Sequence, residues 1–189
     1  PDQLQLMLKP YLVRMRGGGK APAMHSLSWI LWSWIGAFLG ILAVAWIHRF
    51  IPLSSLDKVL LIGSFGASAV LIYGAPHVPY AQPRNLIGGH LVSALAGVAI
   101  SLYLPLPLEL NAALAVATAI VAMQLSKTIH PPGGATALIA VIGSERIQNL
   151  GFDYVWHPVL SGALIMLLVA LLVNNLSADG ARHYPKYWW

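Results

Sequence analysis

The hydrophobic pattern of this chain consists of long apolar stretches separated by scattered charged residues. A helix needs about 20 largely apolar residues to cross the hydrocarbon core of a bilayer, with about 17 as the lower limit. Stretches without Asp, Glu, Lys or Arg cover residues 21–48, 59–83, 85–108, 110–126, 128–144 and 154–178. The pattern predicts an all-α, polytopic membrane protein with about six transmembrane segments, at residues 28–48, 58–75, 86–104, 110–127, 133–143 and 157–176.

The composition supports the membrane assignment and excludes several classes of protein. Apolar residues make up 58% of the 189 residues and charged residues only 9%, whereas a soluble domain carries about 25% charged residues. The chain has no cysteine, which excludes disulfides and thiol chemistry. We expect a multi-pass integral protein of a bacterial inner (plasma) membrane, surrounded by lipid.

The positive charges indicate topology rather than nucleic-acid binding. The net charge is +5, but no basic stretch is interleaved with exposed aromatic residues. With six crossings, eight of the eleven Lys and Arg residues lie on the side of the two termini, which the positive-inside rule places in the cytoplasm. If the second and fifth segments only re-enter the membrane, four crossings remain and the split becomes six to five. The rule therefore favours six crossings.

The sequence divides into three parts. Residues 1–24 form an amphipathic N-terminal cytoplasmic arm, residues 25–176 the transmembrane domain, and residues 177–189 a polar C-terminal tail that ends in aromatic residues. The arm is compatible with a helix on the membrane surface and equally with an ordered cytoplasmic segment.

An internal repeat relates the two halves of the transmembrane domain. A shift of 68 residues places Gly66–Leu71 over Gly134–Ile139, with three identities and three close replacements. The repeats are residues 28–104 and 110–176. Because each half crosses three times, the second half is inverted relative to the first. Inverted repeats whose corresponding helices are broken are typical of transporters, and the substrate binds between the breaks.

The middle segment of each half carries the predicted break. Two prolines and two glycines at residues 131–134 cannot continue a helix. The helix that begins there would present free N–H groups to an anion, and the matching stretch at residues 64–68 would contribute hydroxyl groups. The predicted substrate-binding residues are Ser64, Phe65, Gly66, Ala67, Ser68, Lys127, His130, Pro131, Pro132, Gly133, Gly134, Ala135 and Thr136.

Several basic residues lie beside these breaks. Lys127 could attract anions or could be an interfacial lysine that snorkels. His130 could titrate or donate to an anion, or could bond a loop carbonyl. Arg84 can hold an oxyanion through two donors, or can anchor the cytoplasmic side. The predicted pathway residues are His77, Arg84, Asn85 and His90.

The distribution of metal ligands and carboxylates narrows the chemistry. No two histidines are spaced three or four residues apart, and the segments have no central Asp or Glu. We therefore expect no metal site and no cofactor, and no enzymatic activity, because a paired acid and base is missing. The absence of carboxylates also disfavours a cation pathway, and the basic residues favour an anion.

Several motifs resemble one family of membrane proteins. Residues 129–138, IHPPGGATAL, are similar to the motif that characterises the HPP family, and residues 63–70, 74–77, 81–85 and 88–90 are similar to its other preserved block. The resemblance covers about residues 25–187. It implies an integral membrane protein treated as a transporter, with members in cyanobacteria and chloroplasts associated with nitrite transport. The family is usually described with four spanning helices, which differs from the six predicted here.

These observations predict a channel or transporter for a small inorganic anion, with nitrite as the best single substrate, bound between the two breaks. The alternative is a membrane scaffold or sensor without transport activity, whose arm and tail bind a partner. The small-residue faces are compatible with a homo-oligomer.

Overall fold

The computed structural model describes residues 10, 12–15 and 19–189, and the regular secondary structure of these residues is helical. Each of the six predicted segments coincides with a helical segment to within three residues at either end, when residues 70–74 are counted with the second helix and residues 155–160 with the last. In the described part of the chain, five helical segments are long and apolar enough to cross a membrane, and α6 is shorter. The main helices are α2 (Leu27–His48), α3 (Ser55–Ala69), α4 (Pro83–Tyr103), α5 (Leu108–Leu125), α6 (Pro132–Ile142) and α8 (Ser161–Asn175).

Short elements extend or connect these helices. The π-helical turn η1 (Val70–Gly74) continues α3, and η3 (Val155–Leu160) leads into α8. The connections also contain η2 (Pro79–Ala81), α7 (Glu145–Asn149) and η4 (Gly180–Arg182). The predicted amphipathic arm lies largely outside the described residues.

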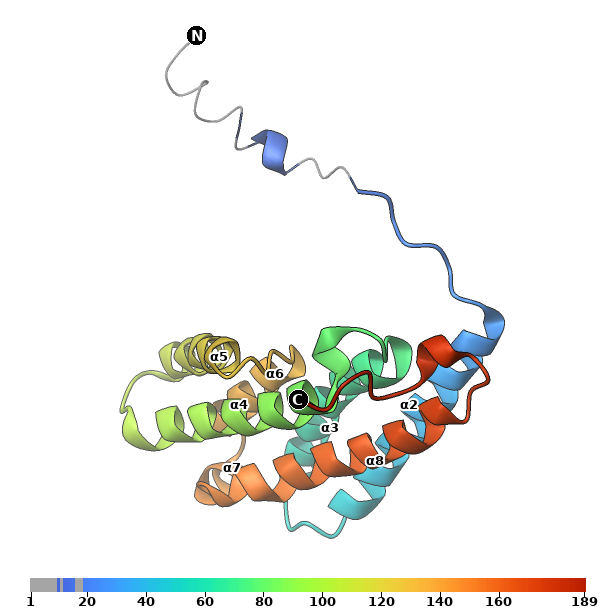
Figure 1. Cartoon of the computed structure of the whole chain (residues 1–189). Helices are drawn as coiled ribbons and strands as arrows, with labels where there is room; N and C mark the ends of the chain where they lie inside the picture. Colours follow the sequence, from blue (N-terminus) through green and yellow to red (C-terminus); the bar gives the residue numbers. More distant parts are fainter. Residues whose placement is uncertain (1–9, 11, 16–18) are drawn as a thin grey trace.

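Successive helices run in opposite directions between two ends of the bundle (Figure 1). At one end, Trp29 Nε1 donates to the carbonyl oxygen of Gly74 over 3.0 Å, which joins the start of α2 to the end of η1. At the other end, Lys58 Nζ donates to the carbonyl oxygen of Arg49 over 3.1 Å. We call the first the tail end, because the C-terminal tail packs there, and the second the opposite end.

The C-terminal tail returns across the tail end (Figure 1). Tyr184 Oη donates to the carbonyl oxygen of Ala81 over 2.8 Å, and the N–H of Lys186 donates to Gln82 Oε1 over 2.7 Å. These bonds satisfy polar groups of the loop between α3 and α4, and they fix the tail beside the start of α4.

Helix α6 begins inside the bundle rather than at its end. Ser64 Oγ, near the middle of α3, donates to the carbonyl oxygen of Pro132 over 3.1 Å, while the N–H of Ser144, just beyond α6, donates to Asp57 Oδ1 over 3.0 Å. The 11 residues of α6 are about 16 Å long, roughly half the thickness of a hydrocarbon core. The segment 126–131 leads from the tail end to the start of α6.

The predicted break in the first half is wrong. Residues 63–68 lie within α3, which is α-helical through Ala69 and then widens into η1. A glycine inside a helix costs about 1 kcal/mol relative to alanine. The packing of Ser64, Phe65 and Ser68, all of which are buried, outweighs that penalty. Tertiary contacts therefore decide the conformation against the local propensity.

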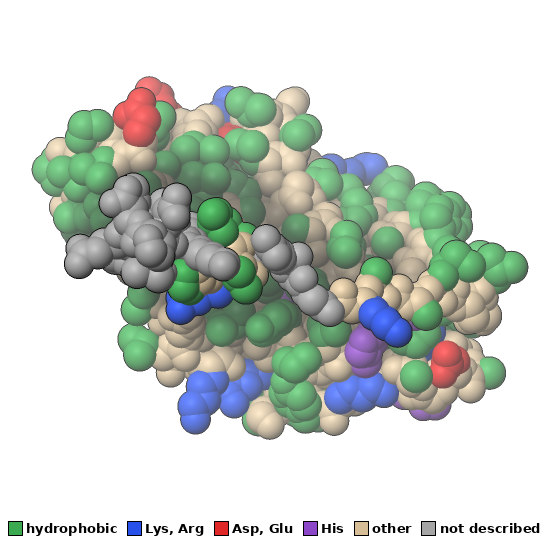
Figure 2. All heavy atoms as spheres, turned by 90° about the horizontal axis from the view of Figure 1, so that it is seen from above, with side chains coloured by type: hydrophobic (Ala, Val, Ile, Leu, Met, Phe, Trp, Pro, Cys, Tyr) green, Lys and Arg blue, Asp and Glu red, His purple; other side chains and the backbone are tan. Residues whose placement is uncertain are grey.

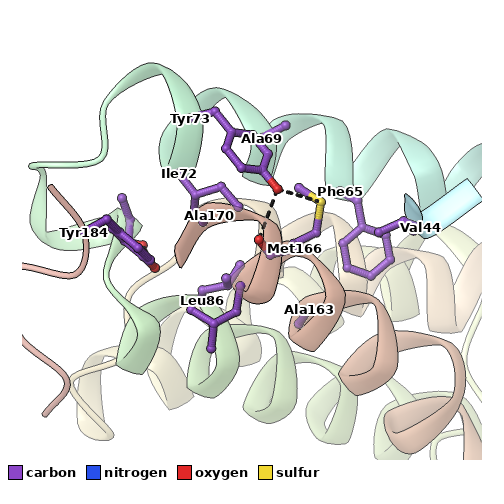
Figure 3. Packing of buried hydrophobic residues seen from close by; sticks show 12 residues of the cluster. Val44, Phe65, Ala69, Ile72, Tyr73, Leu86, Ala163, Met166, Ala170 and Tyr184 are labelled. Atoms are coloured by element: carbon purple, nitrogen blue, oxygen red, sulfur yellow. Dashed lines mark hydrogen bonds between the residues drawn. The ribbon is translucent and has the colours of Figure 1, made fainter. Parts of the chain in front are cut away.

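A core of buried residues joins α2, α3, η1 and α8 (Figure 3). Gly36 and Gly40 of α2 have no side chain where the ring of Tyr73 packs, and a Cβ atom at either glycine would overlap that ring. Tyr73 Oη donates to the carbonyl oxygen of Met166 in α8 over 3.0 Å. The G-x-x-x-G spacing of α2 thus serves contact within the chain.

The surface is that of a membrane protein. Many large apolar side chains are exposed, among them Leu39, Leu42 and Trp46 of α2 and Leu164, Leu168 and Leu172 of α8. In the view of Figure 2, hydrophobic side chains cover much of the visible face, and charged side chains lie mainly toward its edges. Such apolar area is compatible with lipid rather than water.

Candidate functional site

A row of buried polar side chains crosses the interface of α3, α4 and α6. Ser68 Oγ lies 2.9 Å from His130 Nε2 and 2.8 Å from His90 Nε2. His90 Nδ1 lies 2.8 Å from Thr136 Oγ1, which is 3.0 Å from Ser64 Oγ. All five side chains are at most 3% exposed. We call these five residues the His–hydroxyl chain.

A backbone carbonyl fixes the direction of the first hydrogen bonds. His130 Nδ1 lies 2.8 Å from the carbonyl oxygen of Tyr80. That oxygen can only accept, so Nδ1 carries a proton. In a neutral ring Nε2 then accepts from the Ser68 hydroxyl. Because Ser68 has a single proton, its oxygen accepts from His90 Nε2–H, which leaves His90 Nδ1 as an acceptor.

The remaining bonds follow from these assignments. His90 Nδ1 accepts from the Thr136 hydroxyl, whose oxygen can accept from Ser64. The Ser64 hydroxyl has a second acceptor 3.1 Å away, the carbonyl oxygen of Pro132. The His–hydroxyl chain is therefore fully hydrogen-bonded with both imidazoles neutral, as a buried polar network requires.

Glycines of α4 and α6 make the close approach of these elements possible. A Cβ atom at Gly89 would overlap Thr128 and His130, and one at Gly97 would overlap the backbone of Ala137. A Cβ atom at Gly133 would similarly overlap the backbone of Gly89 and the side chain of Ser93. Small residues at a helix interface allow backbones to approach closely, and here they bring the imidazoles of His90 and His130 together.

An open pocket at the tail end lies next to the His–hydroxyl chain. Arg84 Nη2 donates to the carbonyl oxygen of Ser126 over 3.0 Å, and Asn85 Nδ2 donates to that of Ile129 over 2.7 Å. These bonds hold the segment before α6 against the first turn of α4. The pocket has a volume of about 410 Å³ and is lined by Pro79, Tyr80, Arg84, Asn85, Gln124, Lys127, Ile129 and Tyr187.

The pocket adjoins the chain through Tyr80, which lines the pocket and whose carbonyl accepts from His130. It also supplies positive charge, because the half-buried Arg84 and the exposed Lys127 both line it. The structure thus places Arg84 and Lys127 in a basic pocket and His90, His130 and the three hydroxyl residues in an uncharged buried row.

Lys127 has an uncommon backbone conformation. Its φ is 57°, in the left-handed region that non-glycine residues seldom occupy. The N–H of Thr128 donates to the carbonyl of Met123 over 2.8 Å, and that of Lys127 to the carbonyl of Gln124 over 3.1 Å. This is the Schellman arrangement, in which glycine usually follows the helix. A lysine there costs of order 1 kcal/mol, and this suggests a role for its side chain.

The N-terminus of α6 does not offer the predicted row of free donors. The N–H groups of Gly133 and Gly134 donate to the carbonyl oxygens of His130 and Pro131 over 2.8 and 3.0 Å. The prediction of free amides at these two positions is therefore wrong, because the turn before α6 already uses them. Thr136 is available through its hydroxyl, as part of the His–hydroxyl chain.

The other predicted residues have separate locations. Pro131 and Gly134 line a second pocket of about 300 Å³ between α5 and α6, and Ala135 is half-buried. Ala67 is exposed on α3 and a Cβ atom at Gly66 would meet no atom within 4 Å, so neither faces the chain. The remaining members are placed as follows: Pro132 is buried at the start of α6, Phe65 packs 5.4 Å from the His90 ring, and His77 is exposed with its ring 5.8 Å from Trp29.

Sequence reasoning missed three buried polar residues. Asp57 accepts from Ser144 and binds α3 to the segment after α6. Arg182 is 0% exposed, and Tyr154 Oη donates to the carbonyl oxygen of Thr136 over 2.9 Å. Asp57 and Arg182 lie outside the charge-free stretches, so in the sequence they resemble ordinary charged residues at the ends of membrane segments. Tyr154 is the first residue of the last charge-free stretch and resembles an interfacial aromatic residue.

An apolar layer separates the chain from the opposite end. Leu61, Ile139, Tyr154 and Val155 belong to one buried cluster at the level below Ser64 and Thr136. The Tyr154 hydroxyl links this cluster to the level of Thr136, because it donates to the Thr136 carbonyl oxygen over 2.9 Å. The His–hydroxyl chain adjoins the pocket at the tail end, and this buried apolar cluster lies on its other side.

Among the described residues, no group of three or more His, Cys, Asp or Glu side chains is arranged to hold a metal ion. His90 and His130 use both ring nitrogens in the hydrogen bonds of the chain and of Tyr80.

Comparisons with known proteins give the family. Two transmembrane proteins of Dictyostelium discoideum are each 47% identical to this sequence over 98% of the chain, and both are named only as transmembrane proteins. The chain spans 60% and 66% of their lengths. No solved structure matches. The family model described as "HPP, transmembrane region" matches residues 22–185, so the chain is a multi-pass membrane protein that belongs to the HPP family.

Proposed function

We propose that this protein transports a small inorganic anion across the membrane, with nitrite as the best single substrate, as a channel or secondary transporter. The observation that carries this proposal is the basic pocket of Arg84 and Lys127 next to a buried, uncharged row of donors at the start of α6. Guanidinium and ammonium groups attract an oxyanion and replace part of its hydration. No enzymatic activity is part of the proposal.

The charge distribution supports an anion over a cation. The acidic residues of the helical bundle, Asp57, Glu109, Glu145 and Asp153, lie at the opposite end, and the pocket contains none. The His–hydroxyl chain contributes neutral N–H and O–H groups rather than carboxylates. A dehydrated cation would find no carboxylate there, whereas nitrite can replace a hydroxyl or carbonyl oxygen as the acceptor of an imidazole N–H or a hydroxyl.

We propose six crossings, the fifth made by segment 126–131 and the half-length helix α6 together. Ser64 and Pro132, which are 68 residues apart, share a hydrogen bond, and Ser68 lies beside His130. Asp57 lies beside Ser144, so α3 and α6 run antiparallel. The inverted-repeat hypothesis receives support from this pairing, since corresponding helices of inverted repeats cross the membrane in opposite directions.

We propose that the tail end faces the cytoplasm. Arg84, Lys127, Arg182 and Lys186 lie there, against Arg49, Lys58 and Arg146 at the opposite end. The positive-inside rule favours the tail end as the cytoplasmic side. The bacterial plasma membrane stays a prediction, since relatives from an amoeba do not support it.

Nitrite uptake by purified protein in liposomes tests this function. We expect uptake well above that of protein-free liposomes, and at least a tenfold fall in rate for Lys127→Ala and for His130→Ala. Lys58→Ala is the matched control, because Lys58 is a lysine at the opposite end that donates to the Arg49 carbonyl, and its rate should equal wild type. Uptake equal to that of empty liposomes would instead indicate the scaffold or sensor.

A further inference from the structure

The two imidazoles of the His–hydroxyl chain form a unit that anion binding at the entrance does not require. The rings of His90 and His130 have centroids 4.9 Å apart, and Ser68 Oγ bridges their Nε2 atoms. Both rings are at most 1% exposed. His90 lies behind His130 as seen from the pocket, because only His130 bonds the pocket residue Tyr80.

We propose that the His130–Ser68–His90 unit takes up one proton in each transport cycle, so that the anion moves together with a proton. This inference rests on the proposed anion transport and specifies its energy source. Histidine is the side chain whose protonation changes most readily near neutral pH. A buried imidazolium would also supply the positive charge that the interior otherwise lacks.

The geometry accommodates the added proton with one hydroxyl rotation. When His130 is protonated at Nε2, both ring nitrogens donate, Nδ1 to Tyr80 as before and Nε2 to Ser68 Oγ. The Ser68 hydroxyl must then find a new acceptor, and the carbonyl oxygen of Ser64 lies 3.5 Å away. All donors of the unit thus keep an acceptor in the protonated state, which is the condition for a stable buried charge.

The same geometry limits the unit to one proton. Two imidazolium rings at the observed separation would repel each other in a poorly solvated interior, so protonation of one ring disfavours protonation of the other. One nitrite anion and one proton carry no net charge. Transport should therefore respond to a pH gradient and be insensitive to membrane potential.

The surroundings leave these two rings as the proton-binding groups. From α2, His48 lies 5.8 Å from the Phe65 ring, which separates it from His90. Tyr154 donates to the Thr136 carbonyl, and the charged side chains of the pocket are Arg84 and Lys127. Asp57, the acidic residue of α3, bonds Ser54 and Ser144 at the opposite end. Among these groups, only the two rings belong to the buried row beside the entrance.

Proton movement can be measured beside nitrite movement in one experiment. Liposomes that contain the purified protein and a trapped pH indicator receive an inward nitrite gradient, with potassium and valinomycin setting the membrane potential to zero. Protein-free liposomes correct for nitrous acid that crosses the lipid. We expect the interior to acidify by one proton per nitrite. A pH gradient with the acidic side outside should drive nitrite accumulation inside the liposomes.

Matched variants separate this inference from the proposed function. His90→Gln keeps a donor and an acceptor but cannot carry the charge, so we expect the number of protons that enter per nitrite to fall from one toward zero in the nitrite uptake that remains, and pH-driven accumulation to fall at least tenfold. Ser68→Ala, which removes the bridge, should act in the same way and serves if His90→Gln does not fold. His183→Gln, an exposed histidine of the tail, should behave as wild type.

The outcomes are distinct. Nitrite uptake without proton movement in the wild-type protein would overturn the proton coupling and leave the anion transport standing. Wild-type coupling that survives in both His90→Gln and Ser68→Ala would overturn the assignment to this unit. No nitrite uptake at all would overturn both proposals together.

Discussion

Two sets of basic side chains at the tail end use their hydrogen-bonding capacity in opposite ways. Arg182 is fully buried and its Nη atoms make four hydrogen bonds, to the carbonyls of Trp29 and Tyr73 and to the side chains of Ser33 and Asn174. Arg84 makes one hydrogen bond, to Ser126, and lines an open pocket with Lys127.

The difference indicates which cations are available to a ligand. The guanidinium of Arg182 also lies 4.7 Å from the Trp29 ring, so it ties the tail to α2, η1 and α8 and is sealed from water. The cations of the pocket have unused donors and contact with solvent. Arg182 thus serves the structure of the protein, and Arg84 and Lys127 are the cations of the candidate entrance.

Arg182→Met should have the largest effect on stability. It leaves two buried carbonyls and Asn174 without their donor, and each unsatisfied buried acceptor costs about 1–3 kcal/mol. Thermal unfolding and size-exclusion chromatography in detergent should show a much less stable, aggregating protein. Arg182→Lys should recover only part of the loss, because an ammonium cannot reproduce the geometry of a guanidinium. A stability within 1 kcal/mol of wild type for Arg182→Met would remove the contrast.

Arg84→Gln should reverse this outcome, with a small loss of stability and a large loss of transport. Hydrogen bonds to charged groups contribute about 1.5–3 kcal/mol, so the rate of nitrite uptake at low nitrite should fall roughly 10- to 100-fold. Arg49→Gln provides the control at the opposite end, where Arg49 stacks on Trp46. Uptake that is equally reduced in both variants would point to general charge rather than to the pocket.

Two glycine substitutions test how closely α4 packs against α6. Gly97→Ala places a methyl group against the Ala137 backbone, and such overpacking typically costs about 1–3 kcal/mol. Gly66→Ala, on α3, meets open space and should stabilise the helix by about 0.5–1 kcal/mol. Unfolding midpoints measured side by side give the sign of each change, and equal midpoints would contradict the close packing of α4 on α6.

Lys127→Gly should have a small effect on stability, and the change should be stabilising. Glycine relieves the positive φ of Lys127, so the protein should become more stable by about 1 kcal/mol, while the rate of nitrite uptake falls. A variant that gains stability and loses function would show that the lysine is kept for its charge. If uptake is unchanged, Lys127 belongs with the interfacial anchors.

The helices could be predicted from the sequence because the signal is simple. Charge-free stretches give the six segments to within three residues, and the prolines and glycines of residues 131–134 give the half-length of α6. The continuity of α3 through Gly63 and Gly66 could not be predicted, because it depends on packing that propensity does not describe.

The site was only partly accessible to the same reasoning. The sequence predicts Ser64, Ser68, His90, His130 and Thr136 as candidates, but their assembly into one hydrogen-bonded row depends on distances between three helices. The hydrogen bonds of the Gly133 and Gly134 amides within the turn also could not be predicted from the sequence. Arg182 resembles an ordinary cytoplasmic arginine in the sequence, and only its burial reveals its role.

The most direct test of the account is nitrite uptake by liposomes that contain the Arg84→Gln, Lys127→Gln double variant, with its unfolding midpoint measured in parallel. The account predicts a protein as stable as wild type to within about 1–2 kcal/mol and an uptake rate close to that of protein-free liposomes. A folded double variant that takes up nitrite at the wild-type rate would contradict the assignment of this pocket as the anion entrance.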